Sequence, residues 1–420
     1  MSGRFDKNLQ YYKFCLYGLF KNLRFFEAFL ILFFLENGLS YLEIGLLYTI
    51  REIVVAIIEI PSGFIADAFG RRKTLVSSFL IYALSFIGFS FSDNFFLFAS
   101  SMSVFALADA FRTGVHKAMI FNYLKVNNWE GQKVDYYGHT RSWSQAGSAI
   151  SAALAALIVF ISGSYQTIFL IALIPYLLDA FLVWSYPTYL DGKKTTISRD
   201  NFLKAFKGVF EAFVQSIRNA GMLKNLFSLS LYTGYYKSVK DYVQPLIKTM
   251  ALGVPCFTYL NNQKRTAVII GMFYFAAYVL TALASKNSAK FNAWFKHGSK
   301  AMNISMVAGL SIGALVGLSF MNGLYIIAIV GFIIILLIEN IRKPIGISLI
   351  ANSVNERAMA TVLSVQSQAK SVVTAFIAPL LGWLADVYSP GTSLFIVSIA
   401  IVFLGLIFSP ADSNQQAENA

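Results

Sequence analysis

Charged residues are scarce in this sequence. Asp, Glu, Lys and Arg make up 13% of the 420 residues, whereas hydrophobic residues make up 57%. A soluble domain carries about 25% charged residues. So much apolar surface cannot be buried in one aqueous core, because too little polar surface would be left to cover it. The composition therefore excludes an ordinary soluble protein and indicates a membrane protein.

Cysteine and histidine are also scarce. The two cysteines, Cys15 and Cys256, lie far apart, and the three histidines, His116, His139 and His297, are scattered along the chain. Neither set has the spacing of a disulfide framework or a metal site. The sequence also lacks H-E-x-x-H, G-x-S-x-G and a glycine-rich phosphate loop. We therefore expect no metal, no cofactor and no enzyme activity, and keep a membrane enzyme or sensor as a remote alternative.

Long apolar segments are what the sequence has in abundance. A helix that crosses a bilayer needs roughly 20 mostly apolar residues, and by this measure the chain holds about a dozen such segments. They lie near residues 13–35, 42–66, 74–92, 95–119, 141–161, 165–187, 225–246, 267–285, 301–320, 323–344, 359–385 and 389–409. We expect an all-α integral membrane protein with about 12 transmembrane helices.

Basic residues are concentrated in alternate connections between these segments. Lys and Arg number 34 against 21 Asp and Glu, which gives a formal charge of +13. The basic connections lie near residues 71–73, 125–133, 193–207, 286–300 and 342–357. Lys and Arg are retained on the cytoplasmic side. We therefore expect both termini in the cytoplasm, a plasma (bacterial inner) membrane location, and no nucleic-acid partner.

The longest polar connection divides the chain near its middle. Hydrophobic residues recur at helical spacing between Phe202 and Ile217, with charged residues between them, which predicts an amphipathic helix on the membrane surface. We expect an N-terminal six-helix bundle over residues 1–190, a cytoplasmic linker over 191–224 and a C-terminal six-helix bundle over 225–420. Such a duplicated layout is common in secondary transporters.

Ionisable residues inside the expected spans are unevenly distributed. Each one costs about 2.5–3.5 kcal/mol at the centre of a bilayer, so it marks a protein interior or a watery site. Most of them fall on every third span. The first span carries Arg24 and Glu27, and the fourth carries Asp109, Arg112, His116 and Lys117. The seventh carries Lys237, Lys240 and Asp241, and the tenth carries Glu339, Arg342 and Lys343. We expect Arg342 and Lys343 near the inner end of the tenth. The pattern predicts that these four helices line a central aqueous path.

The connection between the second and third spans carries a motif. It reads Gly63-Phe-Ile-Ala-Asp67-Ala68-Phe-Gly70-Arg71-Arg72-Lys73. With the span layout, this segment resembles the major facilitator superfamily, whose signature is G-x-x-x-D-R/K-x-G-R-R/K, and it departs from that signature at Ala68. The resemblance implies two six-helix bundles, transport by alternating access, and a gate at Gly63, Asp67, Gly70, Arg71 and Arg72. It also implies that Asp67 holds a neighbouring helix N-terminus or an arginine.

A second, weaker copy of the start of this motif lies late in the chain. Gly382 and Asp386 have the spacing of Gly63 and Asp67, but no basic run follows them. We interpret this segment as a site of helix packing with a helix end cap.

The charged residues suggest two kinds of role. Arg24 with Glu27, and Lys237 with Asp241, are spaced to pair on one helix face, either as local neutralisation or as switchable pairs. The candidate proton carriers are Glu27, Asp109, Asp179 and His116. The bases Arg24, Arg112, Lys237 and Lys240, with nearby aromatic residues such as Tyr236, would suit a ring-bearing or amphiphilic anion.

We therefore expect a secondary active transporter that moves a small organic solute by alternating access. An anionic or amphiphilic solute, proton coupling and efflux are favoured, and the partners are the solute, protons and the lipid bilayer, with the protein a monomer. The alternatives are an organic-anion symporter or an uncoupled facilitator. The first would need Glu27 for uptake and not for efflux, and the second would not need it at all.

Overall fold

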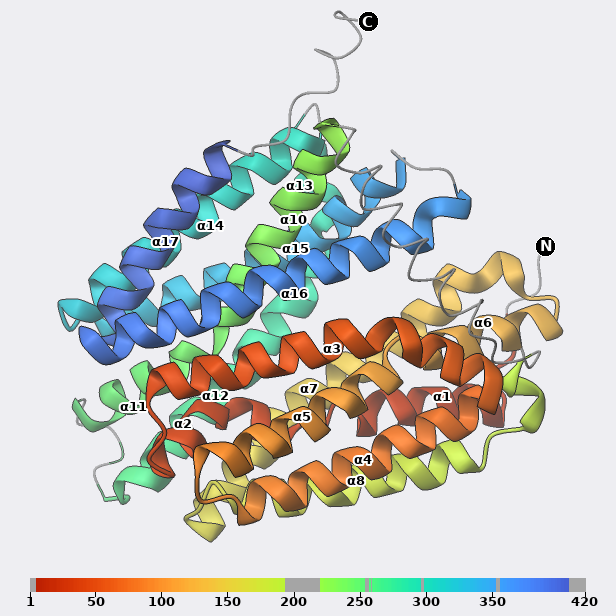
Figure 1. Ribbon diagram of the computed structural model, residues 1–420, viewed down its shortest axis with the longest axis horizontal. Helices are drawn as coiled ribbons and strands as arrows, with labels where there is room; N and C mark the ends of the chain where they lie inside the picture. The colour runs from red at the N-terminus through yellow and green to blue at the C-terminus, as the bar shows by residue number, and fades with distance from the viewer. Residues whose placement is uncertain are drawn as a thin grey trace, which may run out of the picture. The chain divides into compact units, whose positions relative to one another are not determined.

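The computed structural model describes residues 5–192, 220–253, 257, 259–295, 298–352 and 356–407 (Figure 1). Every regular element in these ranges is a helix. The predicted all-α fold is therefore confirmed. The amphipathic helix expected between Phe202 and Ile217 lies outside the described residues.

Within the described residues, eight helical stretches are long and apolar enough to cross a membrane. They are Arg71–Phe91, Phe95–Val126, Asp135–Ser162, Thr167–Trp184, Asn262–Lys286, Gly298–Met321, Tyr325–Leu349 and Ser364–Val387, with a shorter apolar helix over Pro390–Leu406. The other predicted spans, near 13–35, 42–66 and 225–246, are helices that carry charges or are interrupted.

The helices form two compact units. The first contains residues Met1–Phe33, Val54–Leu203 and Phe257–Tyr278, and the second contains Phe34–Ile53, Lys204–Cys256 and Val279–Ala420. The helices α2 (Leu30–Glu36), α3 (Tyr41–Phe69) and α12 (Asn262–Lys286) each contribute to both units. The expected division into residues 1–190, 191–224 and 225–420 stays a prediction.

The remaining helices belong to one unit each. In the first unit they are α1 (Leu9–Phe20), η1 (Phe25–Ala28), α4 (Arg71–Phe91), α5 (Phe95–Arg112), α6 (Val115–Val126), η2 (Glu130–Gln132), α7 (Lys133–Ser162), α8 (Thr167–Trp184) and η3 (Thr188–Asp191). In the second they are α10 (Ala220–Val239), η4 (Lys240–Tyr242), α11 (Val243–Gly253), α13 (Ser288–Ala293), α14 (Gly298–Met321), α15 (Tyr325–Asn352), α16 (Glu356–Val387) and α17 (Pro390–Ile407).

Aromatic side chains fill the core of the first unit, where α4 runs beside both α5 and α8 (Figure 1). Phe26 stacks on Phe169 with 5.8 Å between ring centroids. Phe86 meets Tyr176 edge to face at 4.9 Å. Edge-to-face and offset pairs of this kind contribute about 0.5–1.5 kcal/mol each beyond the area they bury. Part of the chain's high phenylalanine content therefore serves to pack these helices.

Close helix packing marks the second unit, and the late copy of the motif lies at one such contact. A Cβ added to Gly382 of α16 would lie 2.6 Å from the carbonyl carbon of Tyr41 in α3, so only glycine permits this approach. Asp386, one turn later, accepts hydrogen bonds from the backbone amides of Tyr41 at 2.8 Å and Leu42 at 2.7 Å. Packing and an end cap are both confirmed, and the capped end belongs to α3.

Three of the predicted spans are interrupted where their charged residues lie. The first breaks between α1 and α2, around Arg24 and Glu27. The fourth breaks after Arg112, where Gly114 adopts a φ of +80°, a conformation that favours glycine. The seventh breaks at η4, which contains Lys240 and Asp241. The expectation of continuous helices there was wrong. Broken backbone at membrane depth is tolerated where protein or a watery cavity satisfies its polar groups.

Candidate functional site

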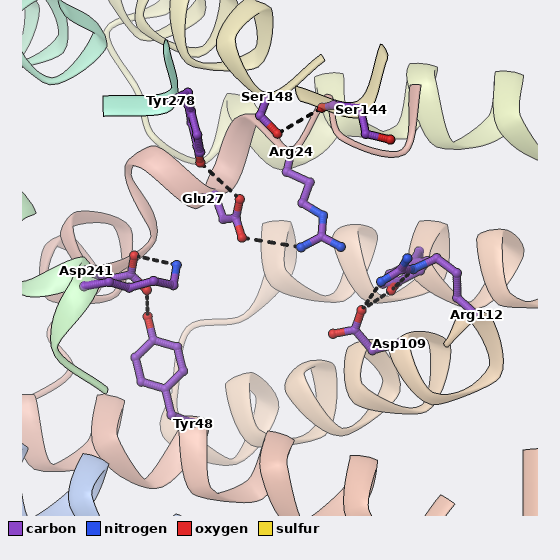
Figure 2. A network of polar contacts seen from close by, with 11 residues as sticks. Arg24, Glu27, Tyr48, Asp109, Arg112, Ser144, Ser148, Asp241 and Tyr278 are labelled. Carbon is purple, nitrogen blue, oxygen red and sulfur yellow. Dashed lines mark hydrogen bonds and ion pairs between the residues drawn. The ribbon is translucent and has the colours of Figure 1, made fainter. Parts of the chain in front are cut away.

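The break in the first span brings together Arg24 and Glu27. An Nη1 atom of Arg24 lies 3.4 Å from Oε1 of Glu27, so the expected ion pair forms (Figure 2). Tyr278 of α12 donates a hydrogen bond to the other Glu27 oxygen at 3.4 Å. The Nε of Arg24 is buried and has no acceptor among the described residues. The Nε of Arg24 is therefore a donor without an acceptor in this part of the structure, while its Nη1 pairs with Glu27.

The end of α5 holds a second acid–base group. Asp109 accepts a hydrogen bond from the Tyr82 hydroxyl and pairs with Nη2 of Arg112 at 3.2 Å. The Nε of Arg112 also donates to the Tyr82 oxygen at 3.1 Å. Figure 2 shows the two charged side chains turned toward each other. Tyr82 comes from α4, a helix without charged residues in its middle, so the search for charged residues in spans did not identify it.

The start of α6 adds two more basic side chains. His116 stacks on the Tyr17 ring with 3.5 Å between centroids, and its Nε2 lies 3.2 Å from the Tyr186 hydroxyl. The ammonium of Lys117 lies 5.5 Å from the centre of the Tyr137 ring. Aromatic residues of α1, α7 and the segment after α8 therefore position these two bases.

A cavity of about 350 Å³ lies between α1, the α5–α6 break and α7. Its basic lining residues are Lys21, Arg112, His116, Lys117 and Arg141. Asn22, Thr140, Ser144 and Gln145 add neutral polar groups, and Phe14, Tyr17 and Tyr137 add aromatic ones. No carboxylate is among the described residues that line it. The arrangement can therefore attract an anion, since Arg112, which pairs with Asp109, is the one base of the lining that forms an ion pair with an acid in the described part of the chain.

The cavity includes some of the predicted site residues and not others. Arg112 and His116 line it, whereas Arg24, Glu27 and Asp109 do not. Lys21 was missed, although it lies inside the first predicted span and the rule that identified Arg24 applies to it equally. The contribution of α7 was also missed, because the spacing of the charges favoured every third helix and α7 is the fifth predicted span.

One buried acid of the first unit has no hydrogen-bond partner among the described residues. Asp179 of α8 is fully buried, and neither of its carboxylate oxygens has a hydrogen-bond partner among the described residues. Lys21 and Arg112 act on it electrostatically. This arrangement is unusual, because buried polar side chains almost always have a hydrogen-bond partner.

The second unit contains an ion pair that the sequence did not predict. Lys237 of α10 pairs with Glu52 of α3, and Ser371 of α16 donates a hydrogen bond to Glu52 at 2.8 Å. The Glu52 side chain is 5% exposed and the Lys237 side chain 27%. The predicted pairing of Lys237 with Asp241 is therefore wrong. Because α10 ends at Val239, the spacing of four residues does not span one continuous helical turn.

Asp241 instead pairs with its neighbour. The Lys240 ammonium lies 2.9 Å from one Asp241 oxygen, and the Tyr48 hydroxyl donates to the other at 3.0 Å (Figure 2). The Asp241 side chain is 5% exposed. Tyr236, another predicted site residue, is half-buried on α10. Glu52 and Asp241 are therefore alike: each pairs with one lysine and accepts a hydrogen bond from one hydroxyl group.

Two charged residues of α15 form hydrogen bonds with neighbouring helices. Glu339 is buried and accepts a hydrogen bond from Thr233 at 3.1 Å. Arg342 is fully buried, donates to Ser305 at 2.9 Å and to the Ser228 carbonyl at 3.3 Å, and so links α15 to α14 and α10. The helix α15 continues to Asn352, beyond the predicted end of the tenth span, and the position of Arg342 near the inner end stays a prediction.

The motif between α3 and α4 forms its own network. Asp67 pairs with Arg71 at 3.1 Å, as the resemblance implied for an arginine. Arg72 donates a side-chain hydrogen bond to the Tyr186 carbonyl at 2.9 Å. The acid at the N-terminus of α4 is Asp191 of η3, which accepts from the Arg72 amide at 2.7 Å.

The two glycines of the motif differ in their surroundings. Gly70 has a φ of +103° and lies against Asp191, so its role in the turn fits the structure. Gly63 has no described atom within 4 Å of the position of an added Cβ, so no close approach among the described residues requires glycine there. The gating role of the motif stays a prediction.

Comparison with known proteins places this architecture in a family. A sequence model of the Major Facilitator Superfamily matches residues 15–376. An uncharacterized MFS-type transporter, YxaM of Bacillus subtilis (strain 168), is 33% identical over 89 residues, which are 21% of this chain and 22% of that relative. The match thus spans about a fifth of the relative's length.

Solved structures agree on the fold. A point variant of nucleoside transporter NupG superposes with a TM-score of 0.76 at 12% identity, covering 95% of this chain and 99% of the other. A D-xylose-proton symporter gives 0.70 at 13% identity, covering 95% of each chain. A bacterial homolog of the human lysosomal transporter Spinster gives 0.69 at 15% identity, covering 96% of each chain. At these identities the likeness shows the fold alone.

Proposed function

This chain belongs to the Major Facilitator Superfamily, and we propose that it is a secondary transporter for a small organic anion whose acidic group binds in the cationic cavity of the first unit. The family and the fold make it an integral membrane transporter. The substrate class rests on one observation, the five basic side chains around a cavity whose described lining holds no acid.

The cavity offers different contacts to different parts of a solute. The Arg112 guanidinium can hold a carboxylate, sulfonate or phosphate through two parallel hydrogen bonds. Lys21 and Lys117 supply compact charges that need no fixed orientation. Asn22 and Gln145 suit a polar body, and the Tyr17 and Phe14 rings suit an apolar or aromatic one. These contacts together support a ring-bearing anion.

Proton coupling is the second part of the proposal. The acids of the first unit that could carry the proton are Glu27, which pairs with Arg24, Asp109, which pairs with Arg112, and Asp179, which is buried with no hydrogen-bond donor among the described residues. Efflux, the cytoplasmic position of both termini, the plasma-membrane location and the monomeric state stay predictions. The cationic cavity supports the second candidate, a symporter that carries anion and proton together.

A binding experiment on the full chain in detergent tests the anion site. The probes are benzenesulfonate, benzoate and phenyl phosphate, with neutral benzenesulfonamide as the matched control, read by thermal shift and calorimetry. A ligand at about 100 times its Kd stabilises a protein by about 2.7 kcal/mol, so binding is measurable as a rise in Tm. We expect the anions to bind and the sulfonamide not to.

Matched variants locate the site. Arg112→Gln should weaken benzenesulfonate binding at least ~10-fold, since one charge-assisted hydrogen bond contributes about 1.5–3 kcal/mol. Lys117→Gln and Arg141→Gln, at more exposed positions, test the same cavity with less risk to folding. Lys264→Gln removes a positive charge from the same unit outside the cavity and should have no effect. Equal binding of sulfonate and sulfonamide, or equal losses in the cavity and control variants, would refute the proposal.

A further inference from the structure

Asp179 is the exception among the buried acids. Each of the others accepts a hydrogen bond from a described residue, namely Glu52 from Ser371, Asp109 from Tyr82, Asp191 from Arg72, Asp241 from Tyr48 and Glu339 from Thr233. Asp179 is fully buried, and no described residue donates to either of its oxygens. An ionised carboxylate in such a place costs several kcal/mol, and a bound proton removes that cost.

The groups that act on Asp179 come from three neighbouring parts of the first unit. The bases are Lys21, which follows α1, and Arg112 at the end of α5. The hydroxyls are those of Tyr17 in α1 and Tyr186 after α8.

These two cations also line the cavity. Besides the pairing of Arg112 with Asp109, the two cations therefore interact with two competing anions, the Asp179 carboxylate and a solute in the cavity. When an anion engages Lys21 and Arg112, ionised Asp179 loses the positive groups that stabilise it. When the anion leaves, the same groups favour the ionised acid again. By thermodynamic linkage, a proton on Asp179 must then favour anion binding by the same factor.

We propose that Asp179 takes up the proton that accompanies an anion into the cavity. Glu27 and Asp109 are less suited to this role. Glu27 is 30% exposed and has Arg24 and Tyr278 as partners, and Asp109 has Tyr82 and Arg112. Hydrogen bonds from Tyr278 and Tyr82 stabilise the ionised forms of those two acids whether or not an anion is bound, whereas ionised Asp179 depends on Lys21 and Arg112, which the anion would engage. The inference rests on the proposed function and assigns to its cavity a coupling residue that does not touch the anion.

Calorimetry on the full chain tests it with benzenesulfonate, which stays ionised across the working pH range. Titration at one pH in two buffers of different ionisation enthalpy gives the number of protons taken up on binding. The wild type should take up close to one proton, and its affinity should rise as the pH falls. Asp179→Asn should bind the anion at least as tightly as the wild type, with proton uptake near zero and no pH dependence. Asp179→Glu should restore the uptake.

Each other outcome has a defined meaning. Undiminished proton uptake in a folded Asp179→Asn variant overturns the inference, and so does anion binding by the wild type without proton uptake. If the wild type binds no anion in preference to benzenesulfonamide, the proposed function itself fails. Should Asp179→Asn not fold, the pH dependence of wild-type affinity and the Asp179→Glu variant still decide, because an affinity independent of pH contradicts the linkage.

Discussion

The Glu52–Lys237 ion pair offers a sharp test of how the second unit is held together. In Glu52→Gln the Lys237 ammonium loses its carboxylate, and in Lys237→Met the Glu52 carboxylate, only 5% exposed, keeps the Ser371 hydrogen bond and the more distant charge of Arg51. Removing one partner of a buried pair costs about 3–5 kcal/mol, since the remaining charge is left uncompensated. Because Lys237 is 27% exposed and water can reach it, we expect about 3 kcal/mol for Lys237→Met and less for Glu52→Gln.

The double variant Glu52→Gln/Lys237→Met should recover much of this loss. Neither charge then remains, so the coupling energy between the two sites should be about 1–3 kcal/mol. The measurement is the free energy of unfolding in mixed micelles of a mild detergent and dodecyl sulfate, for the wild type, both single variants and the double variant. Single losses below ~0.5 kcal/mol that add in the double variant would refute the pairing.

Three further predictions concern other parts of the chain. Asp386→Ala should lower stability by about 1 kcal/mol in unfolding assays by removing the cap on α3, whereas exposed Asp93→Ala should not. Asp67→Asn should slow transport and leave affinity for benzenesulfonate intact, because Asp67 pairs with Arg71 outside the cavity; unchanged turnover would contradict the gate. Glu27→Gln should retain transport driven by a pH gradient in proteoliposomes, because the proton is assigned to Asp179; loss of gradient-driven transport in Glu27→Gln would return the coupling role to Glu27.

The fold was predictable from the sequence to a large degree. Apolar segments of bilayer length can only be helices or strands of a closed barrel, and their length favours helices. The motif around Asp67 then added the family. The breaks at Arg24, Gly114 and Lys240 were not predictable, because hydropathy averages over a window and does not register a few residues of irregular backbone. Such breaks depend on tertiary contacts that satisfy the freed polar groups.

The site was predictable only in part, and the reason is sequence distance. Arg24 and Glu27 are three residues apart, so their pairing follows from local geometry. The partner of Lys237 is Glu52, 185 residues away, and no local pattern connects them. Tyr82 forms hydrogen bonds with both Asp109 and Arg112, and it was not predicted because it also lies far from them in the sequence. The absence of a partner for Asp179 can be recognised only when its surroundings are known.

The central claim is that the first unit binds an organic anion and the protein carries it across a membrane. Counterflow tests this most directly: liposomes containing the full chain are loaded with unlabelled benzenesulfonate, and the entry of labelled benzenesulfonate is measured without a pH gradient. We predict transient accumulation that excess benzenesulfonamide does not inhibit and that Arg112→Gln or Arg141→Gln strongly reduces. Entry no faster than into protein-free liposomes, or equal inhibition by the neutral sulfonamide, would contradict the account.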